Sequence, residues 1–181
     1  LGHAAFLGIG AYTSAMLTKS GWPLMATFIP AMVIAGMIGM IVGTASLRVR
    51  HDFLAITTMG VSFLFTGIIR KQDMLGGEMG VSGIPAPDGG RVGLLLMALG
   101  LTILFIMIMI YVKRSWMGFV FESIAEDEDT ASVLGIDVRR FKLFAFILGT
   151  AGAGLAGALY AHQVRFIGPD SFGFVESVTV L

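Results

Sequence analysis

Two long stretches without a charged residue limit what this chain can fold into more than any other feature does. Residues 92–112 form an apolar run of 21 residues, and residues 143–161 form a second run of 19. A helix rises about 1.5 Å per residue, so each run can cross a hydrocarbon core about 30 Å thick. The polar stretch between them, residues 113–142, must then lie at a membrane surface.

Composition places the whole chain in the same class. Hydrophobic residues make up 56% of it and charged residues 13%, whereas soluble domains usually carry about 25% charged residues. The apolar runs are continuous rather than alternating, which favours spanning helices. The sequence therefore predicts an all-α, polytopic membrane helix bundle. The net charge is zero and cysteine is absent, so nothing indicates a nucleic-acid partner, a disulfide or a thiolate metal site.

About five apolar segments and the start of another are expected. The first is short and rich in small residues at helical spacing, which suits close packing between helices; a half-helix or re-entrant element is the alternative for it. Because the chain begins and ends within apolar sequence, we expect an internal piece of a longer protein, with residues 1–181 belonging to a single transmembrane domain. The segments are residues 1–18, 24–47, 53–69, 92–112 and 143–161, followed by residues 175–181.

The distribution of basic residues predicts which connections face the cytoplasm. Residues 113–142 hold five of the twelve Lys and Arg residues, and cytoplasmic loops are usually enriched in both. Alternation then puts residues 48–52 on the same side, and residues 19–23, 70–91 and 162–174 outside. Seven basic residues fall inside and five outside, which has the expected sign.

The connection 70–91 is rich in glycine and proline, which predicts a structured loop with many turns rather than a helix. Its Gly76-Gly77-Glu78 sequence is not followed by the Gly-Lys-Ser/Thr of a phosphate-binding loop. The sequence therefore gives no sign of a nucleotide site in this connection.

A short helix is predicted within residues 113–142. One continuous amphipathic helix fits poorly because Glu128 falls on the apolar face, and a break at residues 125–127 repairs the pattern. The acids at 126–129 favour the N-terminus of a second helix. That helix is predicted to end at Leu134 with Gly135 as a left-handed cap, and Asp137 to cap the next helix. The predicted apolar face contains Met117, Val120, Phe121, Ile124, Ala131 and Leu134.

Such a short capped helix, held between two spans on the cytoplasmic side, is a surface suited to docking a partner. The alternative for an acidic run of this kind is a solvated surface with no partner.

Hydroxyl groups are most frequent in the segment 53–69. Thr57, Thr58 and Ser62 are the candidate residues for lining a translocation pathway. The alternative is that they form hydrogen bonds between helices, a common use of hydroxyl side chains in lipid.

At this point the residues resemble a known family. Residues 126–136 are similar to the cytoplasmic signature of bacterial ABC-importer permeases, in which Glu-Ala-Ala is followed three residues later by Gly. Here Asp129-Thr130-Ala131 precede Gly135, so the Gly and one Ala match. Further blocks resemble the branched-chain amino-acid permeases of the LivM type; in order along the chain they are residues 1–12, 47–58, 80–85, 126–136, 156–161 and 167–172.

The resemblance implies a permease subunit of an ATP-driven importer in the bacterial inner membrane, and not an enzyme. Its partners would be a second permease, cytoplasmic ATPase subunits and an extracytoplasmic binding protein, and the chain would need no cofactor. Branched-chain amino acids are the implied cargo, with urea or short amides as the alternative. The ATPase would dock on the short helix through the coupling residues Glu126, Asp127, Glu128, Asp129, Ala131, Leu134 and Gly135.

Two other classes fit less well. A secondary transporter would typically carry ionisable residues within its spans, and the cores of these apolar runs contain none. A membrane enzyme would need the acidic cluster to bind a divalent ion, but consecutive acids on a helix diverge and the spacing of an EF-hand is absent. The sequence thus indicates neither a catalytic nor a metal site.

The alternation of spans can be tested by labelling. Cysteines placed at Ser132 and Ser82, in a chain that has none of its own, should react with a membrane-impermeant reagent from opposite sides of the membrane. Reaction of both from the same side would overturn the predicted topology.

Overall fold

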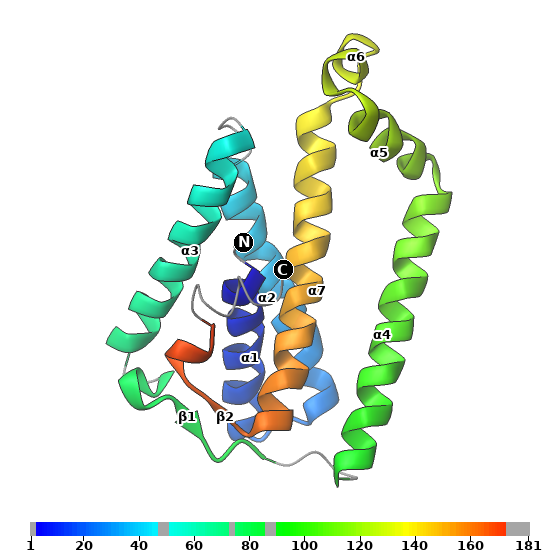
Figure 1. Ribbon diagram of the computed structural model, residues 1–181. Helices are drawn as coiled ribbons and strands as arrows, with labels where there is room; N and C mark the ends of the chain where they lie inside the picture. Colours follow the sequence, from blue (N-terminus) through cyan, green and yellow to red (C-terminus); the bar gives the residue numbers. More distant parts are fainter. Residues whose placement is uncertain (1–2, 47–50, 73–74, 86–89, 173–181) are drawn as a thin grey trace.

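The computed structural model describes residues 3–46, 51–72, 75–85 and 90–172. These are helical almost throughout (Figure 1), which confirms the all-α prediction. The helices are α1 (His3–Lys19), α2 (Leu24–Ser46), α3 (His51–Lys71), α4 (Gly90–Arg114), α5 (Trp116–Glu126), α6 (Glu128–Val133) and α7 (Val138–Val164). The short elements are η2 (Gly77–Met79), β1 (Val81–Ser82), β2 (Phe166–Ile167) and η3 (Pro169–Phe172).

The five predicted apolar segments correspond to α1, α2, α3, α4 and α7. Among the described residues, α2, α4 and α7 are long and apolar enough to cross a membrane. Helix α1 has 17 residues and is not among these three, so whether it is a full span or a half-helix stays open. Residues 47–50, which include most of the predicted polar turn between α2 and α3, lie outside the described part of the structure.

Glycine lets α1, α2 and α7 approach until their backbones touch. A Cβ atom added at Gly10 of α1 would meet the carbonyl group of Gly154 of α7, and one at Gly157 would meet the carbonyl oxygen of Leu7. On the other side of α7, Gly154 lies against Ala35 of α2. Small residues allow this approach in lipid, where van der Waals packing holds helices together. The predicted small-residue contacts of α1 are confirmed.

A small extramembrane layer closes one end of this bundle. Strands β1 and β2 pair antiparallel with Val81 opposite Ile167, and the Lys19 ammonium group at the end of α1 donates to the Ser82 carbonyl oxygen at 3.3 Å. Apolar side chains from this layer pack into one cluster with Ala11, Tyr12 and Ala161. Residues 75–85 of the connection thus form a structured loop as predicted, anchored to the helices by residues far away in sequence.

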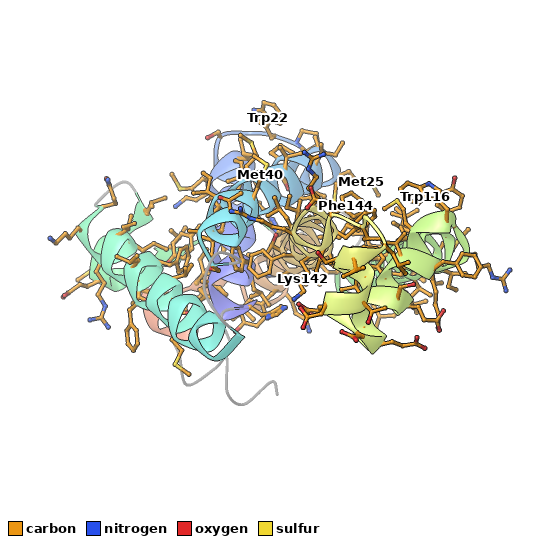
Figure 2. The ribbon with its side chains drawn as sticks, turned by 90° about the horizontal axis from the view of Figure 1, so that it is seen from above. Trp22, Met25, Met40, Trp116, Lys142 and Phe144 are labelled. Atoms are coloured by element: carbon orange, nitrogen blue, oxygen red, sulfur yellow. The ribbon has the colours of Figure 1, made fainter. Side chains whose placement is uncertain are left out.

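The two ends of the molecule carry different connections (Figure 1). Helices α5 and α6 lie at one end, and β1, β2 and the turn between α1 and α2 lie at the other. The axis of α4 lies farther from α7 than those of α1 and α2 do (Figure 1), but its side chains Met97, Leu101 and Phe105 still pack against the bundle. Only 6% of its most apolar window is buried, so most of its large apolar side chains face lipid or protein outside the described residues. Seen along the helices, Trp22 extends outward from the bundle (Figure 2).

The backbone contacts of α7 generate a testable prediction. Gly157→Ala should lower the thermal stability of the purified protein, because the new methyl group meets the Leu7 carbonyl oxygen; overpacking of this kind typically costs about 1–3 kcal/mol. Gly149→Ala, on the same helix with no atom near the added Cβ, is the matched control and should be neutral or mildly stabilising. Equal melting temperatures for the two variants would contradict the backbone contact.

Candidate functional site

The chain reverses direction between α4 and α7 through a corner formed by residues 115–137, called here the α5–α6 corner. Ser115 caps α5, its hydroxyl oxygen accepting from the Met117 amide at 3.2 Å. The turn from α4 is so tight that a Cβ atom at Gly118 would meet the Lys113 carbonyl oxygen. Helix α5 therefore leaves the axis of α4 sharply and crosses towards α7 (Figure 1).

Aromatic rings fasten α5 to the beginning of α7. Trp116 and Phe121 both pack edge-to-face against Phe141, each with ring centroids 5.8 Å apart. Ile124 of α5 is also buried. This edge-to-face geometry is the favoured one for aromatic pairs, so α5 and the start of α7 form one packed unit.

Asp127 separates α5 from α6. Its own amide donates to the Ser123 carbonyl oxygen, which ends α5, and its carboxylate accepts from the Asp129 and Thr130 amides at 2.9 and 3.3 Å, which starts α6. The Thr130 hydroxyl donates to the same carboxylate at 2.6 Å, and this bond, with the two amides, lowers the pKa of Asp127. The predicted break is confirmed, but Glu126 ends α5 rather than beginning the short helix.

Helix α6 ends in the predicted glycine cap, but its last helical residue comes one position earlier than expected. Helix α6 ends at Val133, and Gly135 has a φ of +87°. The Ile136 amide donates to the Ala131 carbonyl oxygen at 3.1 Å and the Gly135 amide to that of Ser132 at 3.0 Å, which together form a Schellman motif. Asp137 then caps α7, its carboxylate accepting from the Arg140 amide at 3.2 Å. Both predicted caps are confirmed.

An ion pair joins α6 to α7. The Glu128 carboxylate of α6 contacts the Lys142 ammonium group of α7, with both side chains partly shielded from solvent. Figure 2 shows Lys142 on the side of α7 that faces the α5–α6 corner. Glu128, the residue that did not fit the pattern of one continuous amphipathic helix, is therefore the acid that pairs with α7.

The predicted common face of Ala131 and Leu134 is wrong. Ala131 is 1% exposed and packs within this chain, whereas Leu134 is 74% exposed. The helix has ended before Leu134, so the helical wheel no longer describes where that side chain points. Val133, absent from the sequence-based set, is 87% exposed. The sequence feature that could have identified Val133 is a large apolar side chain in a short helix made mostly of polar residues.

The exposed surface of α6 and the residue after it therefore includes two large apolar side chains on the same short segment as several acids. Glu126, Asp127 and Asp129 are exposed on the corner, next to Val133 and Leu134. Large exposed apolar side chains outside a membrane span often mark an interaction site. The caps and the ion pair hold this surface in one conformation.

The candidate pathway residues are only partly described. Ser62 is 2% exposed and faces the protein interior, and its carbonyl oxygen accepts from the Thr66 hydroxyl at 3.0 Å. The side chains of Thr57 and Thr58 lie outside the described part of the structure. That these residues line a pathway stays a prediction. Among the described residues, no group of three His, Asp or Glu side chains is placed to hold a metal ion.

Comparison with known proteins decides the family. The family model described as "Branched-chain amino acid transport system / permease component" matches residues 1–181. The chain belongs to this family. As a permease of this family it is a multi-pass membrane protein, in keeping with its apolar helices.

Relatives support the same assignment. The high-affinity branched-chain amino acid transport system permease protein LivM of Escherichia coli K12 is 33% identical, over 100% of this chain and 50% of the relative. The probable branched-chain amino acid transport permease protein LivM of Methanocaldococcus jannaschii is 25% identical, over 81% and 45%. The autoinducer 2 import system permease protein LsrC of Yersinia pestis is 26% identical, over 92% and 47%.

This permease chain spans about half the length of the curated relatives it matches. No solved structure matches it.

The capping of α6 can be tested by hydrogen exchange. Asp127→Ala removes the acceptor for two amides and a hydroxyl group, so the amides of α6 should exchange faster. Asp129→Ala is the matched control, because Asp129 is also an exposed acid of the same turn but caps nothing. If exchange were equally fast in both variants, Asp127 would not stabilise α6 as its N-terminal cap.

The lowered pKa gives the capping a defined pH dependence. The ionised Asp127 stabilises α6 fully above the usual pKa of a free Asp, about 3.9, and this stabilisation is lost as the pH falls through the lowered value in the folded protein. Protection of α6, corrected for intrinsic exchange, should therefore stay constant from neutral pH to about 4.

Proposed function

We propose that this chain is part of the membrane permease of an ATP-driven importer for branched-chain amino acids in a bacterial inner membrane. The observation that carries the proposal is the family match over residues 1–181, joined to a helix bundle with a rigid polar corner at one end. Its partners are cytoplasmic ATPase subunits, a second permease and an extracytoplasmic binding protein. ATP hydrolysis belongs to the ATPase chains.

Branched-chain amino acids are favoured as the cargo by the names of the relatives. Two of the three relatives above are named for branched-chain amino acids and one for autoinducer 2. None of these three is named for urea or an amide, so the alternative cargo has no specific support. The apolar character of the described bundle fits a solute with an aliphatic side chain.

The α5–α6 corner is the element on which the ATPase docks in this proposal. Val133 and Leu134 offer exposed apolar side chains at the end of α6, and the exposed acids Glu126, Asp127 and Asp129 add negative charge at its beginning. A cleft with an apolar floor and basic side chains at its rim is the complementary surface. Ala131 supports this surface from within, because it is buried against its own chain.

Movement of the docked ATPase reaches the bundle through α7. Helix α6 is tied to α7 by the ion pair of Glu128 with Lys142, and α5 by the rings packed on Phe141. Helix α7 in turn touches the backbone of α1 at Gly157 and Gly10. An ATPase that bound every permease conformation equally could not shift their populations. Its contacts with α6 must therefore differ between the inward-facing and outward-facing states.

The docking assignment is tested by introducing a charge at the two exposed apolar residues. Leu134→Glu and Val133→Glu should weaken co-purification of the ATPase and abolish ATP-driven leucine uptake, because each places an unpaired charge in an apolar contact. Gly135→Val should act in the same direction, since a β-branched residue is strongly disfavoured at a φ of +87°.

Met79→Glu is the matched control, because Met79 is 89% exposed but belongs to η2 at the opposite end of the molecule. It should leave ATPase association unchanged. Normal ATPase association and normal uptake in the Val133 and Leu134 variants would contradict the coupling assignment. The corner would then be a solvated surface with no partner.

A further inference from the structure

A cleft of about 630 Å³ lies between the beginning of α4 and the end of α7. We propose that it is a binding site for a zwitterionic amino acid with a branched aliphatic side chain, occupied as the solute enters the permease. The inference rests on the proposed function and adds a site to it. The residues that line the cleft are Gly90, Leu94, Leu95, Ala98, His162, Gln163 and Arg165.

The two walls of the cleft differ in chemistry. Helix α4 supplies an apolar wall through Leu94, Leu95 and Ala98, and α7 supplies a polar wall through Gln163 and Arg165. Small-molecule sites usually combine an apolar lining with a few polar groups, and have volumes of about 300–1,000 Å³. An aliphatic side chain fits the first wall, and a carboxylate and an ammonium group fit the second.

Arg165 is the residue expected to bind the carboxylate. It caps α7 with a φ of +59°, and among the described residues it is the only one other than glycine with a positive φ. Glycine would adopt this backbone conformation with less strain. We therefore take the guanidinium group to be the reason for an arginine at this position. Planar guanidinium groups bind carboxylates through two parallel hydrogen bonds.

A buried polar cluster holds the α7 wall in place. His162, 1% exposed, lies with Nε2 3.0 Å from the Ser14 hydroxyl of α1, which is 2.7 Å from the Thr27 hydroxyl of α2. Its Nδ1 lies 3.4 Å from the Pro85 carbonyl oxygen. His162 thus links α7 directly to α1 and to the loop before α4, and through Ser14 to α2. Because this anchor is one turn from Arg165, the polar wall is preorganised for a ligand.

The position of the cleft fits entry of solute. It lies at the end of the molecule that carries β1 and β2, opposite the α5–α6 corner. With the corner on the cytoplasmic side, the cleft opens towards the side from which an importer receives its cargo. A solute released by a binding protein would meet Arg165 before the interior of the bundle.

Protection of an introduced cysteine tests this site directly. Leu95 is 61% exposed, and Leu95→Cys in a full-length transporter without other reactive cysteines should react with a small thiol reagent. The complex is reconstituted without its binding protein, so that any protection reports the permease itself. Leucine should slow the labelling. Leucinamide, which lacks the carboxylate, and glycine, which lacks the aliphatic side chain, should slow it much less.

Arg165→Gly in the same background should raise the leucine concentration for half-protection at least about ten-fold, as expected for loss of a charged hydrogen-bonded pair. It keeps the backbone conformation, so folding is preserved. Arg165→Lys should recover part of the protection. Lys71→Gln, at the same end but on α3 and outside the cleft, is the control and should behave like the parent.

Two results would overturn the site: no protection by leucine up to its solubility limit, or equal half-protection in the parent and the Arg165→Gly variant. Failure of the proposed function is recognised separately. In that case the complete wild-type transporter, with its binding protein and ATP, would not import leucine, whatever the labelling shows.

Discussion

The structure depends on the direct contact of backbones where α7 crosses α1 and α2. Lipid removes most of the hydrophobic force between helices, so their association rests on how closely they can approach. Gly10, Gly154 and Gly157 allow that approach, because any Cβ atom at these positions meets a neighbouring residue. Packed at this distance, α1, α2 and α7 form the centre of the described structure, and the other elements are arranged around them.

Helix α7 connects the two candidate sites. With 27 residues it is about 40 Å long, and its first turns hold the α5–α6 corner through Phe141 and Lys142. Its last turn carries His162 and ends at Arg165 in the cleft. A displacement imposed on α6 therefore reaches the cleft through one continuous helix. This geometry gives a physical basis for the proposed coupling of an ATPase at the α5–α6 corner to the proposed solute site in the cleft.

Helix α4 is packed less tightly than α7, and the proposed coupling requires one wall of the cleft to move relative to the other. It packs on the bundle through Met97, Leu101 and Phe105 without the backbone contacts that join α1 and α7. It also supplies one wall of the cleft through Leu94 and Leu95 and ends at Arg114, where the corner begins. The cleft thus lies between a tightly packed helix and a loosely packed one. Elements with few buried apolar contacts open most easily, so the distance between these two walls is the part of the site expected to change most.

The sequence by itself determined the features that arise from neighbouring residues. Apolar runs define the spans, and Asp127, Gly135 and Asp137 end and begin helices through bonds to amides within a few positions. Only the tertiary structure decided that Val81 pairs with Ile167, that Ser14 meets His162 across 148 positions, and that Ala131 is buried while Val133 is exposed. Helical periodicity describes a regular helix alone. Which distant segments meet depends on how helices of particular lengths pack, and local pattern carries no information about that.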